Sequence, residues 1–188
     1  MSGPLRPGGW KDPYSSALIT ERQSDYATAL GNATPYTPQV IVNGTGELQL
    51  TNDAQVTRAL TAATSAGTVP VEIGAARVDG GASPMLIVHI TIDGAEETKN
   101  ANAYLAVALD HAQSDVLRGE NAGRNLSYVA VVQALKQIGK VQKGREFQQD
   151  VRMPLKPGTD PTNLRVIVFV QEPRLGKVIG AAMWRAGK

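Results

Sequence analysis

The chain has 188 residues, of which 42% are hydrophobic and 19% charged, a composition typical of a folded globular protein and not of a disordered one. The net charge is +2 with Lys and Arg scattered, which argues against nucleic-acid binding, since that function needs clustered basic residues. The absence of cysteine excludes disulfides, thiolate nucleophiles and cysteine-ligated metals, and no apolar run approaches the roughly 20 residues that span a bilayer.

The N-terminal part of the chain predicts a short lead-in followed by a helix. Met1–Asp12 is rich in Gly and Pro, and Met1–Trp10 lacks the apolar core of a signal peptide. Ser15 or Ser16 caps a helix that runs to about Leu30, and Gly31 suits its left-handed C-terminal position. Residues at four-residue spacing form one face of this helix: Leu18, Arg22, Tyr26 and Leu30.

A proline-rich turn and a hairpin follow the helix. Pro35 and Pro38 each force the preceding residue out of the helical region. Val40–Val42 is apolar throughout, which predicts a strand covered on both faces. Asn43–Gly44 predicts a tight hairpin turn, and Thr45–Leu50 its more polar edge partner.

A second helix is predicted from Asn52, the N-cap, with Gln55 completing a capping-box pattern. Gly67 ends this helix, and Pro70 follows shortly after. Its apolar face is formed by Val56, Ala59, Leu60 and Ala63.

From Val69 onward, short apolar segments alternate with turns rich in Gly, Pro and Asp, which predicts a β-sandwich of about seven strands. In Leu86–Ile92 every second residue is apolar, as in a strand with one buried face. Ser127–Ile138 also fits a helix, and we interpret it as a strand. The predicted strands are Val69–Val78, Met85–Ile92, Ala103–His111, Asn125–Ile138, Glu146–Leu155, Leu164–Gln171 and Lys177–Trp184.

Several motifs, spread from Trp10 to the end of the chain, carry a resemblance to a known family. They are Gly9–Trp10–Lys11–Asp12–Pro13 with Arg22–Gln23 and Tyr26–Ala27, Tyr36–Thr37–Pro38–Gln39 with Val42–Asn43–Gly44, Arg118–Gly119–Glu120–Asn121–Ala122–Gly123–Arg124 with Val131–Val132, and Val170–Gln171 with Gly180–Ala181. These motifs resemble a bacterial family of thioredoxin-like secreted proteins of unknown function, catalogued as domain of unknown function 1223.

The resemblance implies a thioredoxin-like fold, a cis Thr37–Pro38 bond and a periplasmic or secreted location. The chain departs from the family pattern in two respects. The Cys-x-x-Cys segment that the resemblance places upstream of Trp10 is absent, and Tyr128 and Ala130 stand where the family tends to have His and Asn.

We therefore expect an α+β protein in two parts. Residues 1–68 are predicted to form a truncated thioredoxin-like α/β unit of helix, hairpin and helix, and residues 69–188 a β-sandwich domain. Because Val40–Val42 would lack its neighbouring parallel strands, the first unit is expected to pack on the sandwich or on a second chain.

The sequence contains no motif that identifies a catalytic residue, a metal site or a cofactor site. His89 and His111 have no neighbours at ligand spacing, and no H-E-x-x-H or G-x-S-x-G motif occurs. The Gly-rich segments precede strands, whereas a phosphate-binding loop precedes a helix.

Two stretches are candidates for binding. One is the turn ahead of the hairpin, and the other is the run from Arg118 to Arg124. In one interpretation, the guanidinium groups of that run bind an anion or a peptide end. In the other, Glu120 pairs with an Arg and the loop satisfies its own polar groups. The candidate binding residues are Tyr36, Thr37, Pro38, Arg118, Glu120, Asn121 and Arg124.

Three functions remain open from the sequence. The first is a non-catalytic, extracytoplasmic protein that binds a protein or peptide, since the groove beside a cis-proline holds extended peptides by backbone hydrogen bonds without cysteine. The second is a fragment of a thiol-disulfide oxidoreductase whose Cys-x-x-Cys half lies upstream. The third is a structural subunit whose open sheet is completed by a partner or by a second copy.

Overall fold

The computed structural model describes residues 12–32, 34–48, 52–65, 68–94, 100–117 and 122–186. Strands predominate in these ranges, and neither helix is long and apolar enough to cross a membrane. The elements are α1 (Ala17–Ala29), β1 (Val40–Val42), β2 (Gly46–Leu48), α2 (Asp53–Ser65), β3 (Val71–Asp79), β4 (Met85–Ile92), β5 (Ala101–Asp115), β6 (Asn125–Val141), β7 (Phe147–Pro154), the 3₁₀ turn η1 (Pro161–Asn163), β8 (Leu164–Gln171) and β9 (Val178–Arg185).

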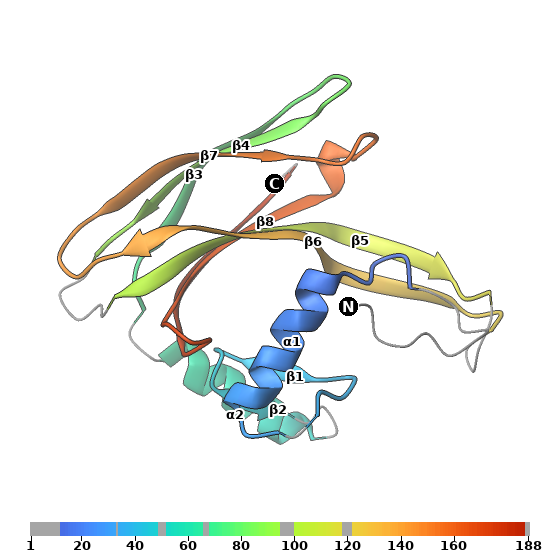
Figure 1. The fold of residues 1–188 in the computed structure, drawn as a ribbon, viewed down its shortest axis with the longest axis horizontal. Helices are drawn as coiled ribbons and strands as arrows, with labels where there is room; N and C mark the ends of the chain where they lie inside the picture. The colour runs from blue at the N-terminus through green and yellow to red at the C-terminus, as the bar shows by residue number, and fades with distance from the viewer. Residues whose placement is uncertain are drawn as a thin grey trace.

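Strands β3 to β9 form two antiparallel sheets around one hydrophobic core, with orders β3–β4–β7 and β6–β5–β8–β9 (Figure 1). The alternation of the sequence explains which side chains enter the core. In β4 the side chains of Leu86, Val88 and Ile90 are fully buried, whereas His89 between them faces solvent. From the opposite sheet, β8 buries every second side chain in the same core: Leu164, Val166, Val168 and Val170.

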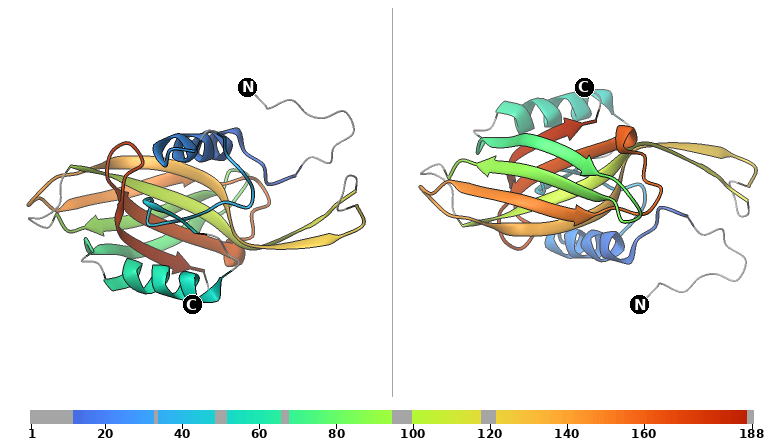
Figure 2. Two further views of the ribbon diagram at one scale, coloured as in Figure 1. Left: turned by 90° about the horizontal axis from the view of Figure 1, so that it is seen from below. Right: turned by 90° about the horizontal axis from the view of Figure 1, so that it is seen from above.

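The seven predicted strands all occur, and the α+β class fits the structure. The ambiguous segment Ser127–Ile138 lies within β6 and is a strand. Strands β5 and β6 are longer than predicted, because they pair from Ala101 opposite Val141 to Asp115 opposite Asn125. The far end of this hairpin projects beyond the rest of the sheet (Figure 2).

Helix α1 packs on the outer face of the four-stranded sheet. Tyr104 of β5 and Phe169 of β8 are register partners, and their rings stack at 5.1 Å between centroids. The guanidinium of Arg22 lies over both rings, at 5.4 and 5.7 Å. Arg22 also donates a 2.6 Å hydrogen bond to the Gln171 side chain, which is 1% exposed and donates in turn to the Tyr26 hydroxyl.

The β1–β2 hairpin turns at Asn43 and Gly44, as predicted. Both residues have positive φ, 49° and 75°, as a type I′ turn requires. A Cβ atom on Gly44 would lie 2.5 Å from the carbonyl oxygen of Gly176, so only glycine permits this approach. The Asn43 carbonyl accepts a hydrogen bond from the amide of Val178, which docks the hairpin on the start of β9.

The predicted coverage of Val40–Val42 on both faces is wrong. All three side chains are half-buried, because among the described residues α2 and the β8–β9 connection cover the hairpin only in part. Helix α2 is capped as predicted, by a hydrogen bond from the Gln55 amide to the Asn52 side chain. Its packing is shallow, and Leu60 remains 53% exposed. Trp10, which belongs to the first motif of the family resemblance, lies outside the described residues.

Candidate functional site

The best candidate site is the turn that enters β1. The Thr37–Pro38 peptide bond is cis, which confirms the expectation that followed from the sequence resemblance. Tyr36, Thr37 and Pro38 are all exposed, with Tyr36 43% accessible. We call residues 36–38 the cis-proline loop. It presents an aromatic ring and a proline to solvent directly before a strand.

A network of hydrogen bonds centred on Glu47 of β2 holds the cis-proline loop in place. The Glu47 carboxylate accepts a 2.6 Å hydrogen bond from the Asn32 amide, which follows α1, and another from the Gln39 side chain. The Tyr36 hydroxyl lies near this carboxylate and interacts with it electrostatically. From α1, the Gln23 amide donates to the Tyr36 carbonyl at 2.9 Å. The loop is therefore tied to both α1 and β2.

These bonds set the ionisation of the network. The Asn32 amide lowers the pKa of Glu47 most, and the Gln39 amide and the Tyr36 hydroxyl lower it further. Partial burial raises the pKa of Tyr36, and the charge of Glu47 adds to that effect. Near neutral pH the site thus holds a carboxylate and a neutral phenol.

A Glu47→Gln variant is expected to lose a pH-dependent part of the stability. Because the folded-state pKa of Glu47 lies below its ordinary 4.5, the ionised carboxylate stabilises the folded protein above that pH. This contribution disappears as the pH falls through the folded-state pKa. Denaturant titrations should show a constant difference in unfolding free energy between wild type and variant near neutrality, shrinking below about pH 4.5.

The exposed Glu146 provides the control for this experiment, since Glu146→Gln changes the same functional group on the β6–β7 turn. The pH dependence that Glu47→Gln shows and Glu146→Gln does not is the part assigned to the network. A Glu47→Gln difference that stays constant down to about pH 3 would show that the network does not favour the ionised carboxylate.

The strand behind the cis-proline loop has a free edge. In the described part of the chain, β1 pairs with β2 only, with Ile41 opposite Glu47. Its second edge has no strand beside it, and an unpaired edge offers backbone N–H and C=O groups to another extended segment. The site therefore combines exposed side chains with unused backbone hydrogen-bonding capacity.

The segment from residue 12 to residue 65, which carries this site, is acidic. Residues 12–65 contain five acidic and two basic side chains, a net charge of −3, whereas the whole chain carries +2. The remainder of the chain is accordingly basic. A positively charged ligand would be attracted to this segment in preference to the sandwich.

A family model described as "Protein of unknown function (DUF1223)" matches residues 7–171. The chain belongs to this family. A comparison with curated proteins gives no match.

Two solved structures show that this DUF1223 protein shares its fold with other bacterial proteins. A crystal structure of an Agrobacterium tumefaciens protein aligns over 96% of the present chain and 75% of its own, with a TM-score of 0.69 and 22% identity. HBP35 of Porphyromonas gingivalis aligns over 87% of the present chain with a TM-score of 0.61 and 15% identity. The chain spans 56% of the length of that HBP35 structure.

The second predicted site of this DUF1223 protein lies elsewhere. Arg118, Glu120 and Asn121 lie outside the described residues. Arg124 is exposed at the end of the β5–β6 hairpin, where its carbonyl accepts a hydrogen bond from the Val116 amide. Both figures place this end of the hairpin away from β1, so the structure does not join Arg124 to the cis-proline loop (Figures 1 and 2).

Sequence reasoning missed the residues that support the cis-proline loop. Glu47 could have been found, because the Asn43–Gly44 turn fixes the hairpin register and sets Glu47 opposite Ile41. Asn32 and Gln23 carry no such signal, since their side chains reach the site only through the way α1 packs.

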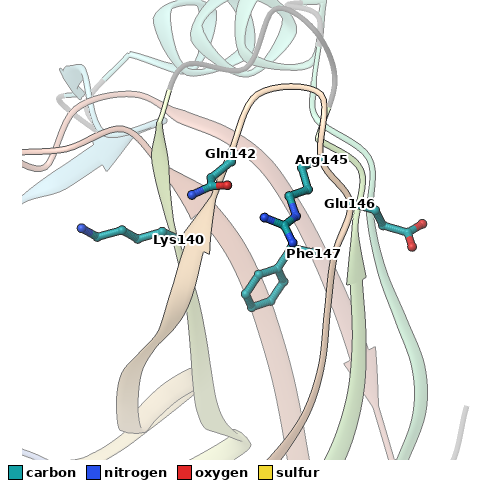
Figure 3. Close-up of a pocket in the computed structure, with 5 residues that line it drawn as sticks. All are labelled: Lys140, Gln142, Arg145, Glu146 and Phe147. Atoms are coloured by element: carbon teal, nitrogen blue, oxygen red, sulfur yellow. The ribbon is translucent and has the colours of Figure 1, made fainter.

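Other polar groups of the DUF1223 protein do not converge on a site. A hollow of about 240 Å³ on the β6–β7 turn is lined by Lys140, Arg145 and Glu146 among others, and Figure 3 shows Lys140 and Glu146 extending in opposite directions. His89 pairs with Asp150 across β4 and β7 at 2.7 Å, on the surface. Within the described ranges, no group of three or more His, Asp or Glu side chains could hold a metal ion.

One charged cluster has a structural role. Asp110 of β5 accepts two hydrogen bonds from the Arg165 guanidinium of β8, one of them at 2.7 Å, and Arg185 Nε of β9 lies 3.4 Å away. The Arg165 hydrogen bonds hold the pKa of Asp110 below its ordinary value. The cluster therefore ties three neighbouring strands together on the outer face of the sheet.

Proposed function

We propose that this protein is a non-catalytic binding protein that holds an extended, basic polypeptide segment against the cis-proline loop and the free edge of β1. The observation that carries the proposal is the position of this edge, next to three exposed residues and within the acidic segment of residues 12–65. We also propose a location outside the cytoplasm, which rests on the sequence resemblance alone.

The binding mode is strand addition. An extended peptide beside β1 would form backbone hydrogen bonds with the unpaired edge, and these give affinity without a catalytic group. Tyr36 is the side chain best suited to anchor it, since tyrosine buries a large apolar surface and is enriched where binding energy concentrates. Glu47 and the negative charge around it favour Lys or Arg in the bound segment.

The test uses a fluorescein-labelled decapeptide that alternates Lys with Val and a matched peptide in which Glu replaces each Lys. We expect fluorescence anisotropy to show saturable binding of the Lys peptide and about tenfold or weaker binding of the Glu peptide. The Tyr36→Ala variant should bind the Lys peptide about tenfold less tightly, because it lacks the anchoring ring.

Leu60→Ala is the matched control, since Leu60 is an exposed apolar side chain of the same unit on α2. It should bind like the wild type. Equal affinity for both peptides, or equal loss in Tyr36→Ala and Leu60→Ala, would contradict the proposal. Light scattering would assign this surface to a second copy instead if the wild type had the molar mass of a dimer and the Tyr36→Ala variant that of a monomer.

A further inference from the structure

A cavity of about 380 Å³ opens into the core between the two sheets, on the side where β6 and β7 diverge. Its walls are mainly apolar, and two of them are fully buried core residues, Val107 of β5 and Leu164 of β8. Leu109, Ala134 and Leu155 complete the apolar lining. This volume falls near the lower end of the range for small-molecule sites, about 300–1,000 Å³.

A β-bulge shapes the mouth of the cavity. Val107 pairs with Ala134 and Ala108 pairs with Val132, so Gln133 is an extra residue in β6. Gln133 lines the cavity, and its side-chain oxygen accepts a 3.1 Å hydrogen bond from the ammonium of Lys156. Lys156 belongs to the connection between β7 and η1, so this bond crosses from one side of the opening to the other.

The polar groups at the mouth of the cavity differ in how many of their hydrogen-bond donors and acceptors remain unused. The Asp160 carboxylate accepts two hydrogen bonds from Thr162, and the Asn163 side chain is bonded to the backbone of His111. Lys156 donates to Gln133, but an ammonium has three donors. Within the described part of the chain, no carboxylate lies within salt-bridge distance of Lys156. The mouth therefore holds one cation, Lys156, that forms no ion pair and keeps unused donors, and one carboxylate, Asp160, whose hydrogen bonds go to Thr162.

We infer that this cavity binds a small amphiphile, with its apolar chain between the sheets and its carboxylate or other anionic headgroup on Lys156. The apolar walls gain from excluding water, and the headgroup supplies the countercharge and accepts the unused donors of Lys156. The Gln133 amide keeps Lys156 at the opening. This site is separate from the cis-proline loop, so it stands independently of the proposed peptide binding.

Decanoate tests the inference, with decylamine as a probe of equal chain length and opposite charge. Calorimetric titration should show decanoate binding once per chain, and decylamine binding about tenfold or more weakly. Amide chemical-shift changes on adding decanoate should concentrate at Val107, Leu109 and Leu164. The Lys156→Glu variant should bind decanoate about tenfold or more weakly, because the attraction becomes repulsion.

Two matched controls separate the site from general effects. Lys140→Glu makes the same charge change on β6 away from the cavity and should bind decanoate like wild type. Ala134→Leu fills the cavity and should abolish binding, whereas Ala181→Leu, at an exposed position of β9, should not. Absence of saturable decanoate binding, or wild-type binding by Ala134→Leu, would overturn the inference.

Discussion

A Gln171→Leu variant is expected to lower the free energy of unfolding by about 2–3 kcal/mol, because a buried hydrogen-bonding centre is replaced by an apolar side chain. Gln171 is 1% exposed and accepts from Arg22 while donating to the Tyr26 hydroxyl and the Gly176 carbonyl. Leucine would leave the guanidinium, the hydroxyl and the carbonyl without this partner. The substituted side chain has similar size, so lost bonds and not a cavity account for the effect.

The measurement combines urea denaturation with native-state hydrogen exchange. Because Gln171 joins α1 to the sheet, exchange protection should fall more in Ala17–Ala29 than in the buried part of β5. Gln148→Leu is the control, an identical change at an exposed position of β7, and should shift stability by less than about 0.5 kcal/mol. Equal destabilisation by the two variants would refute the role assigned to Gln171.

A Gly180→Ala variant is expected to lose about 1–3 kcal/mol through overpacking. Gly180 of β9 lies against Val69, in the segment that leads into β3 of the other sheet, and a Cβ on Gly180 would come within 2.4 Å of the Val69 carbonyl oxygen. That oxygen belongs to the backbone, and the neighbouring Val69 amide is itself fixed by a 2.7 Å hydrogen bond to Ile179. Relief of the clash therefore requires β3 and β9 to separate.

Thermal and urea denaturation would measure this change. Gly46→Ala is the matched control, because a Cβ on Gly46 meets no atom within 4 Å. That variant should keep wild-type stability within about 0.5 kcal/mol. If Gly180→Ala were equally stable, the contact between β3 and β9 would have to be looser than the structure has it.

Much of the strand pattern was predictable because its causes are local. A period of two residues in Leu86–Ile92 reports a strand with one buried face wherever that strand lies in the sheet. Positive φ at Asn43 and Gly44 follows from their own side chains, and the cap of α2 lies within four residues of the sequence.

The predicted coverage of Val40–Val42 failed because burial is a property of neighbours. Three consecutive β-branched residues indicate a strand, but they do not say how many elements surround it. Among the described residues, α2 and the β8–β9 connection cover this strand in part, so both faces stay partly exposed. For the same reason, the second edge of β1 has no paired strand in the described part of the chain.

The candidate site likewise contains residues that the sequence identified and residues that only the structure shows. Tyr36, Thr37 and Pro38 were identified from the sequence through a family motif, and so was the cis bond. Their support was not identified, because Glu47 and Gln23 reach the loop from other elements. No sequence pattern indicated the sandwich cavity. Gln133 in the β-bulge and Lys156 in the loop after β7 come together only once both sheets have formed.

The sequence by itself determined the elements and their buried faces, since propensity, periodicity and turn chemistry act between near neighbours in the chain. Only the tertiary structure decided what those elements do together. It placed Arg22 on a stacked aromatic pair and against Gln171, which is 149 positions away in the chain. Contacts of this kind depend on which strands become neighbours, and hydrophobic periodicity specifies a face but not the partner that covers it.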